Sequence, residues 1–279
     1  TLDVVEALKA RVYLEMEDYQ NAAAAAQGLI NSKRYTLISD GDAYKKMWLN
    51  DVGTEAIWQF AMSKTETGSN ALGSSFMGIV DKLPRPSYLP VKSVLNLYDK
   101  ENDIRYDAYF TTGLIDRQVG DDIEVTYCSK WPGNPELYEG KSNNVNKLKA
   151  FRISEMYLIA AEAYAMLNQE DKASEMLNEL KKIRIKGWTE TVYNGAALMQ
   201  EIQDERVREL FAEGNRLFDM KRWKIGMKRS SSDAQRDDYL PALGTDIEKE
   251  ATDNRWVWPI PKDEMDSNPQ LKGQQNPGY

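Results

Sequence analysis

Residues 151–184 read FRISEMYLIAAEAYAMLNQEDKASEMLNELKKIR and predict two helices joined by a short polar turn. Met156, Ile159 and Ala163 recur at intervals of three and four residues, which is the spacing of one face of an α-helix. The polar residues 168–171 interrupt this pattern, which resumes at Ala173. The segment therefore predicts an antiparallel helical hairpin.

A second hairpin pattern occupies residues 1–31. Val5, Leu8 and Val12 share one face of its first predicted helix, and Ala22 and Ala26 share a face of its second. The two hairpins match at a constant displacement of 151 residues: Ala10 with Ala161, Tyr13 with Tyr164, Met16 with Leu167, Ala22 with Ala173 and Leu29 with Leu180. Alanine at a helix crossing beside tyrosine is typical of tetratricopeptide-like units, and two unrelated amphipathic hairpins are the alternative. Because a stable stack normally needs about three units, we expect another part of the structure to complete it.

The charged stretch ERVRELFAEGNRLFDMKRW, residues 205–223, falls within a third predicted helix from Leu198 to Ile225. Acidic and basic side chains recur there at three- and four-residue spacings, which place them on shared helix faces. We expect them to form a structural ion-pair network: Glu205, Arg206, Glu209, Glu213, Arg216, Asp219 and Arg222. Gly214 costs about 1 kcal/mol in a helix interior, so we expect close backbone packing there. A catalytic cluster of glutamate and arginine is the alternative.

The composition excludes several classes of function. The 279 residues contain no histidine, which removes Ser-His-Asp and Cys-His nucleophile systems and histidine-ligated metal sites. No glycine-rich nucleotide-binding loop is present, so we expect neither a cofactor nor a metal. With 44 acidic and 36 basic residues the net charge is -8, which disfavours nucleic acid as a partner.

The chain also offers no sign of a membrane span or a disulfide. No run approaches the roughly 18 apolar residues that a spanning helix needs, and the one cysteine, Cys128, is expected to be packed in the core. Thr1 opens directly into a helical pattern without a signal peptide. The sequence thus predicts either a cytosolic protein or one whose N-terminus lies further upstream.

Residues 63–149 differ from the helical blocks. Glycine, proline, serine and asparagine are frequent there, and a helical pattern persists only near residues 91–98, so we predict a loop-rich insertion. Insertions on repeat scaffolds often carry the binding surface, and flat aromatic rings suit the apolar faces of sugars. The predicted ligand contacts in this segment are Tyr88, Tyr109, Tyr138 and Asn143.

Four segments together resemble the SusD/RagB family. The C-terminal WPIPKDEMDSNPQLKGQQNPGY, residues 258–279, is similar to the ending of that family. The helix of residues 205–223, FRISEMYLIAAEAYA at residues 151–165 and DKENDIRYDAYF at residues 99–110 are similar to three more of its segments. Asn215 stands where the family usually has a histidine, and family members are usually longer at the N-terminus.

The resemblance implies an all-α, tetratricopeptide-like fold formed by one N-terminally incomplete SusD-like domain over residues 1–279. We assign residues 1–62 and 150–226 to the helical scaffold, 63–149 to the insertion and 227–279 to an irregular C-terminal segment. It further implies a surface-exposed lipoprotein of the outer membrane that binds an oligosaccharide without cleaving it. Its partner would be a SusC-like TonB-dependent transporter, and its only membrane attachment a lipid anchor outside this chain.

Three alternatives to this function differ in what they would bind or cleave. A tetratricopeptide scaffold would bind protein partners in a groove. A glycosidase would use a pair of the many carboxylates. A related transporter component would import another nutrient, such as a peptide.

Overall fold

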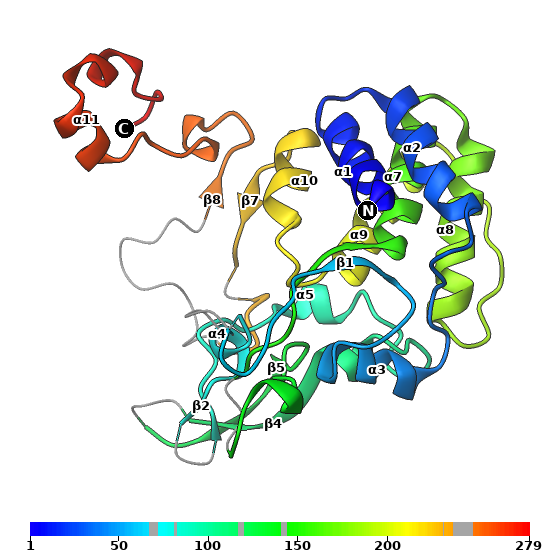
Figure 1. Cartoon of the computed structure of the whole chain (residues 1–279), viewed down its shortest axis with the longest axis horizontal. Coiled ribbons are helices and arrows are strands. Elements are labelled where there is room, and N and C mark those ends of the chain that lie inside the picture. Colours follow the sequence, from blue (N-terminus) through cyan, green and yellow to red (C-terminus); the bar gives the residue numbers. More distant parts are fainter. Residues whose placement is uncertain (67–71, 81–82, 117–119, 141–143, 231, 237–247) are drawn as a thin grey trace. The chain divides into compact units, whose positions relative to one another are not determined.

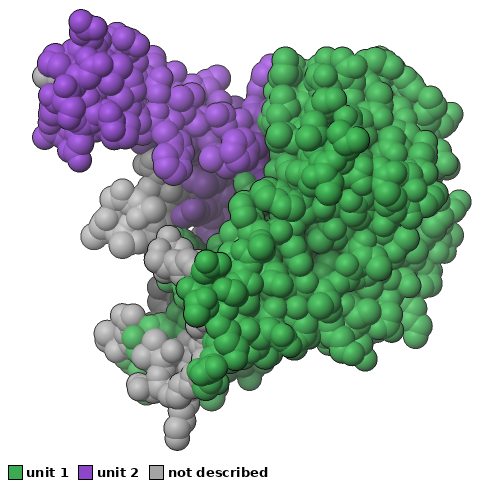
Figure 2. All heavy atoms as spheres, viewed as in Figure 1, with its two compact units in different colours: residues 1–214 green, residues 215–279 purple. Residues whose placement is uncertain are grey.

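The computed structural model describes residues 1–279 except 67–71, 81–82, 117–119, 141–143, 231 and 237–247. The chain divides into two compact units, Thr1–Gly214 and Asn215–Tyr279 (Figure 2). Helices dominate the first unit, and the strands of the described residues are short and paired two by two. The all-α prediction is confirmed.

Two helical hairpins form the scaffold (Figure 1). Their helices are α1 (Leu2–Glu15) with α2 (Tyr19–Asn31), and α7 (Ile153–Met166) with α8 (Glu170–Arg184). Both bounds of α7 lie 151 residues beyond those of α1, and the left-handed turn residues Glu17 (φ 59°) and Asn168 (φ 57°) are the same distance apart. The repeat predicted from alanine and tyrosine positions is therefore a structural repeat.

Small residues allow the hairpins to stack closely. Helix α2 packs against both α1 and α7, and α7 packs against α8. Ala10, Ala22, Ala26, Ala161 and Ala173 are all fully buried at these crossings. A helix with alanine at its contact face brings its backbone close to its neighbour, which favours the dense packing of a protein interior.

The apolar face of α1 lies elsewhere than the pattern suggested. Val5, Leu8 and Val12 are 47%, 49% and 44% exposed, while Ala7 and Ala10 of the same helix are buried. The equivalent residues of α7 are fully buried, and α7 contacts α1, α2, α8 and α9. Among the described residues, no helix covers the corresponding face of α1 in the same way.

This difference predicts unequal effects of two equivalent substitutions. Ile159 is fully buried and lies 151 residues after Leu8. Ile159→Ala should lower the free energy of unfolding by about 2–5 kcal/mol because it leaves a cavity, whereas Leu8→Ala should change it by about 0.5 kcal/mol. Urea denaturation of both variants measures the two values, and equal losses would contradict the assignment of the faces.

The insertion leaves and rejoins the scaffold at one small sheet. Strand β1 (Ala56–Gln59) pairs antiparallel with β6 (Lys149–Arg152), which leads directly into α7. Before this sheet lies α3 (Gly41–Leu49), whose Tyr44 and Trp48 are buried. The base of the insertion is therefore tied to the helical core.

Within the insertion, short elements alternate with loops. They are α4 (Ser74–Met77), β2 (Ile79–Val80), β3 (Leu83–Pro84), α5 (Lys92–Leu95), α6 (Tyr106–Tyr109), β4 (Phe110–Ile115), β5 (Ile123–Cys128) and the 3-10 turn η1 (Pro135–Leu137). The β4–β5 hairpin, paired from Phe110↔Cys128 to Ile115↔Ile123, was not predicted. Its signal is the alternation of Ile123, Val125 and Tyr127 with polar residues in β5.

Cys128 is buried at the end of β5, as predicted. Burial raises the pKa of its thiol to about 11, from 9.0. Since only the thiolate reacts, a thiol reagent at pH 8 should modify the folded protein about a hundred-fold more slowly than the urea-unfolded chain. Absorbance of the released thiol reporter measures both rates, and comparable rates would show that the β4–β5 hairpin opens readily.

The third predicted helix is interrupted. Helix α9 (Gly195–Glu209) ends before the predicted Ile225, and α10 (Arg216–Arg222) begins only after Ala212 (φ 57°) and Gly214 (φ 85°). The expected close packing at Gly214 is also wrong, because a Cβ there would meet no atom within 4 Å. Gly214 instead supplies a left-handed backbone conformation, which glycine adopts without steric cost.

The second unit contains α10 and several short elements. These are β7 (Met227–Lys228), β8 (Glu248–Lys249), the 3-10 turns η3 (Asn254–Trp256) and η4 (Pro269–Gln274), and α11 (Lys262–Ser267). Strands β7 and β8 pair antiparallel. Across the part of the chain that the structure describes, no helix combines the length and apolarity needed to cross a bilayer.

Candidate functional site

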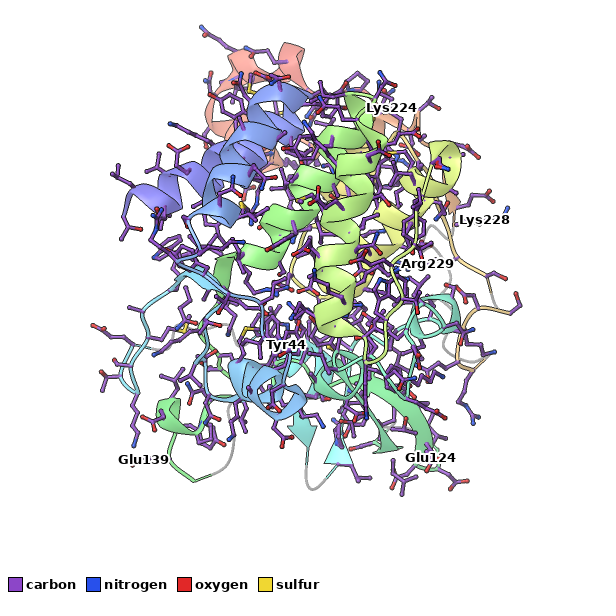
Figure 3. The ribbon with its side chains drawn as sticks, turned by 90° about the vertical axis from the view of Figure 1, so that its right-hand side faces the viewer. Tyr44, Glu124, Glu139, Lys224, Lys228 and Arg229 are labelled. Atoms are coloured by element: carbon purple, nitrogen blue, oxygen red, sulfur yellow. The ribbon has the colours of Figure 1, made fainter. Side chains whose placement is uncertain are left out.

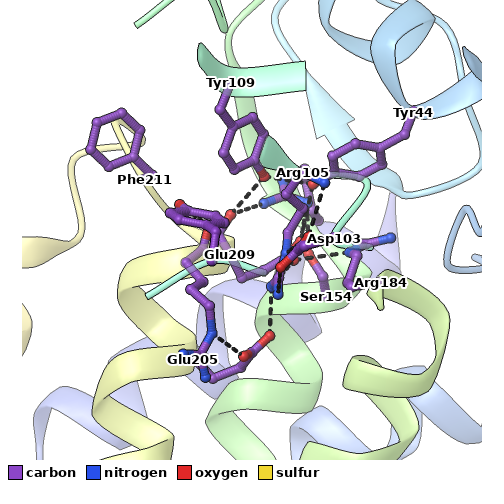
Figure 4. Close-up of polar contacts among 12 residues, drawn as sticks. Tyr44, Asp103, Arg105, Tyr109, Ser154, Arg184, Glu205, Glu209 and Phe211 are labelled. Carbon is purple, nitrogen blue, oxygen red and sulfur yellow. Dashed lines mark hydrogen bonds and ion pairs between the residues drawn. The ribbon is translucent and has the colours of Figure 1, made fainter. Parts of the chain in front are cut away.

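The carboxylate of Glu209 lies at the centre of a buried ion-pair cluster (Figure 4). It accepts hydrogen bonds from Arg184 Nη2 at 2.9 Å, from Arg152 Nη1 at 2.8 Å and from Arg105 Nη1 at 3.1 Å. Arg184 is the last residue of α8, Arg152 ends β6 just before α7, and Arg105 lies in the turn before α6. One side chain of α9 thus joins three separate segments.

Further acidic groups balance these arginines. Asp103 and Glu205 pair with Arg105 at 2.7 and 2.5 Å. Glu55 and Glu213 pair with Arg152 at 3.1 and 2.6 Å. With Lys130 on Glu213 and Arg208 on Glu205, five cations face five carboxylates among the described residues: Arg105, Lys130, Arg152, Arg184 and Arg208 with Glu55, Asp103, Glu205, Glu209 and Glu213. Such balance is what allows charges to remain in a low-dielectric interior.

The cluster holds its acids in the ionised form. Burial alone would raise the pKa of Glu205, but the charges of Arg105 and Arg208 outweigh it and lower the pKa to about 2. In the same way, Arg184 and Arg152 overcome burial and hold the pKa of Glu209 well below its ordinary value. A buried carboxylate without a proton near neutral pH can neither reach a substrate nor act as a general acid. We therefore interpret the cluster as structural.

The members of the predicted network fall into separate groups. Glu205, Glu209 and Glu213 belong to the buried cluster. Arg206 lies 3.8 Å from Glu162 of α7, whereas Asp219 and Arg222 pair at 2.8 Å within α10. Arg216 is placed over the ring of Trp223, with 5.9 Å from the guanidinium carbon to the ring centre.

Arg105, Arg152 and Arg184 were missed as partners of these acids because they lie far away along the chain, whereas Arg208 lies only three residues after Glu205. Arg184 offered a signal, since it continues the apolar face of α8 formed by Ala173, Leu177 and Leu180. A charged residue at a core-facing helix position indicates a buried partner. Arg105 and Arg152 gave no comparable local pattern.

The pKa of Glu205 predicts how stability depends on pH. Because its pKa is about 2 in the folded protein and 4.5 as the ordinary value, the folded state binds fewer protons between these pH values. The carboxylate therefore stabilises the protein above pH 4.5, and this contribution is lost as the pH falls toward 2. Glu205→Gln should cost about 3–5 kcal/mol near neutral pH by leaving buried arginines underpaired and should flatten the acid dependence.

Urea denaturation at several pH values measures both effects. Glu179→Gln is the matched control, because Glu179 pairs with Lys182 on the exposed side of α8. That change should cost about 0.5 kcal/mol or less. A Glu205→Gln variant as stable as this control would overturn the structural role of the cluster.

Aromatic side chains pack around the cluster, and Tyr109 is one of them. Tyr109 is 0% exposed, its hydroxyl lies 2.5 Å from the hydroxyl of Tyr44, and it donates to the carbonyl of Glu209 at 3.1 Å. Figure 4 shows both tyrosines beside Glu209. Because protein atoms cover its ring, Tyr109 offers no surface to a ligand in this structure, and the core position explains the aromatic residue there.

The other predicted ligand contacts lie differently. Tyr88 is 65% exposed, and its ring centre is 6.3 Å from that of Phe76 on α4. Tyr138, after η1, is half-buried. The next residue, Glu139, is labelled in Figure 3 and pairs with Lys64 at 3.1 Å. Asn143 lies outside the described residues.

One exposed aromatic pair was not predicted. Trp58 and Phe60 are 41% and 44% exposed, and their ring centres are 4.6 Å apart. Trp58 is the exposed residue of β1 that follows buried Ile57, and Phe60 comes directly after the end of the strand. The main chain fixes them, since Phe60 N donates to the carbonyl of Leu148 at 3.0 Å. The signal was two aromatic residues, two positions apart, at the end of a short apolar segment.

Adjacent exposed aromatic rings suggest a binding surface. Clustered apolar groups that face solvent usually mark a site of contact with a ligand or a partner. The Trp58–Phe60 pair presents two rings to solvent, and Tyr88 presents one beside the partly buried Phe76. Together they are the candidate ligand-binding groups of the first unit.

Comparison with known proteins relates the chain to one family. A model of the SusD family matches residues 111–279. SusD-like protein P38 of Formosa agariphila is 25% identical over 311 residues, which cover 95% of this chain and 58% of the relative. The chain thus spans little more than half the length of that relative.

Solved structures give the same relationship. A SusD superfamily protein from Bacteroides thetaiotaomicron superposes with a TM-score of 0.76 at 27% identity, over 98% of this chain and 59% of the other. A SusD-like carbohydrate binding protein from Bacteroides vulgatus has a TM-score of 0.72 over 98% of this chain and 60% of the other. At 19% identity, the second likeness shows the shared fold alone.

Proposed function

Since the chain belongs to the SusD family, we propose that it binds an oligosaccharide at the cell surface and does not cleave it. The observation that carries this proposal is the Trp58–Phe60 pair, with rings 4.6 Å apart and open to solvent. Tyr88, exposed beside Phe76, would add a further stacking surface.

Stacking explains why aromatic residues would serve here. A pyranose ring has an apolar face of C–H groups that can cover an aromatic ring and exclude water from both. A pair of rings at 44° to each other suits a chain of sugar residues that changes direction between its units. Hydrogen bonds to the hydroxyl groups would then set the orientation.

The chemistry of the described residues supports binding without catalysis. The chain has no histidine, and the acids of α9 serve in a buried, balanced cluster. Their ionised state leaves them unable to protonate a glycosidic oxygen. Glycan binding followed by transfer to another component fits these properties better than hydrolysis.

The proposal includes a cellular setting. Family membership supports a lipid-anchored protein on the outer membrane that delivers its ligand to a SusC-like TonB-dependent transporter. The anchor would lie outside the 279 residues, and the transporter would be the protein partner.

Calorimetric titration with a panel of plant, host and microbial oligosaccharides tests the proposal. At least one oligosaccharide should bind without release of reducing sugar. Trp58→Ala should then weaken binding about ten-fold, which corresponds to about 1.4 kcal/mol, because an aromatic platform is lost. Tyr88→Ala should weaken it less, since that ring belongs to the more widely spaced pair.

Val192→Ala is the control, because Val192 is exposed but lies apart from the insertion in sequence. It should leave the affinity unchanged. If no oligosaccharide of the panel binds, the glycan-binding proposal is wrong. If only peptides bind, the ligand is a peptide nutrient. Release of reducing sugar would identify a glycosidase.

A further inference from the structure

A surface pocket of about 380 Å³ lies between the end of α8, the turn after α5 and one side of α9. Trp188 and Lys186 line it from the segment after α8, Asp99 from the turn, and Glu201 and Arg208 from α9. Its volume is at the lower end of the range of roughly 300–1,000 Å³ found for small-molecule sites. The exposed rings of Trp58, Phe60 and Tyr88 do not line it.

The structure holds the walls of this pocket in place. Trp188 Nε1 donates to Asn178 Oδ1 at 3.0 Å, and the Lys181 ammonium lies 4.1 Å from the centre of the same indole. The backbone N–H of Lys186 donates to the carbonyl of Asn102 at 3.0 Å, which joins the two loops. An aromatic ring fixed in this way can receive a ligand at little cost in conformational entropy.

Glu201 presents an unused acceptor to the pocket. Its Oε1 atom accepts hydrogen bonds from Lys181 at 2.5 Å and from Arg208. Its Oε2 atom accepts none from the described residues, and the side chain keeps 19% of its surface exposed. An ionised carboxylate can accept on both oxygens, so Oε2 is available to a hydroxyl donor.

The remaining charges point to a neutral ligand. Lys186 is exposed and forms no ion pair with the described residues, and Asp99 is exposed at the rim. These two opposite charges offset each other, Lys181 compensates the charge of Glu201, and Arg208 is balanced by Glu205 in the buried cluster. The pocket thus combines hydrogen-bond donors and acceptors with an indole ring and carries no net charge. These properties suit a ligand with many hydroxyl groups and one apolar face.

We propose that this pocket binds one neutral pyranose residue, with the sugar ring on Trp188, one hydroxyl donating to Glu201 Oε2 and another accepting from Lys186. The inference rests on the proposed glycan function and adds a second, separate point of contact. A glycan that reaches both places would be held by two contacts, which raises its apparent affinity.

Methyl glycosides of glucose, galactose and mannose test the pocket directly. We expect at least one of them to shift the indole N–H signal of Trp188 in a saturable way in heteronuclear NMR spectra of the whole 279-residue chain. Trp188→Phe identifies that signal by its loss. Lys186→Gln should weaken the sugar affinity several-fold, measured by chemical-shift titration, because a hydroxyl loses its charged donor.

Lys182→Gln is the matched control, since Lys182 is an exposed lysine near the same end of α8 that does not line the pocket. It should leave the titration unchanged. Trp188→Ala should abolish the binding. If the Trp188→Ala variant does not fold, Lys186→Gln still tests the proposal, because the Lys186 side chain forms no ion pair with the described residues and its loss should not disturb the fold.

The outcomes separate this inference from the proposed function. Suppose that Trp58→Ala removes the response of Trp188 to methyl glycosides and that Lys186→Gln leaves this response intact. The second site would then be disproved, and glycan binding by the protein would not be affected. A response to acetate or glycine that equals the response to sugars would overturn the sugar assignment. No response to any methyl glycoside would also overturn it, whereas the calorimetric panel tests glycan binding independently.

Discussion

The structure depends on one buried carboxylate. Glu209 contacts arginines that lie 25, 57 and 104 residues away along the chain: Arg184, Arg152 and Arg105. Burying these charges is costly, and only close pairing on every side compensates for it. The cluster therefore restricts the chain to an arrangement in which α9, the ends of α8 and β6 and the turn before α6 all meet.

This restriction positions the candidate binding surface. Arg152 ends β6, and β6 pairs with β1, which carries Trp58 on its outer side. The ammonium of Lys130 lies against two buried rings, 4.1 Å from the centre of Trp48 and 3.9 Å from that of Tyr109. Contacts of this kind between a cation and an aromatic face attach the insertion to the scaffold. A binding site on such a rigid base can hold its rings at a fixed spacing.

The pocket beside Trp188 depends on the same cluster. Arg208 donates to Glu205 inside the cluster and to Glu201 at the pocket. The charged interior and the pocket are thus continuous, and α9 contributes to both. This connection gives α9 two roles, since its inward side chains stabilise the fold and Glu201 faces a possible ligand.

The hairpins and their repeat could be predicted from the sequence, because the spacing of alanine, tyrosine and apolar residues indicates which face of a helix packs against its neighbour. The acids of α9 were recognised for the same reason. Tyr109 could not be placed, since an aromatic residue in a loop-rich segment has the same local pattern whether it packs in a core or faces solvent.

The exposed face of α1 and the partners of Glu209 were likewise beyond local pattern. Val5 and Leu8 resemble their equivalents in α7, but α7 contacts α8 and α9 in addition to α1 and α2, and only this packing distinguishes a covered face from an open one. The sequence alone therefore determined which segments are helical and which residues are acidic, basic or aromatic. Only the tertiary structure decided which of them meet, because burial and ion pairing depend on residues that are distant in the chain.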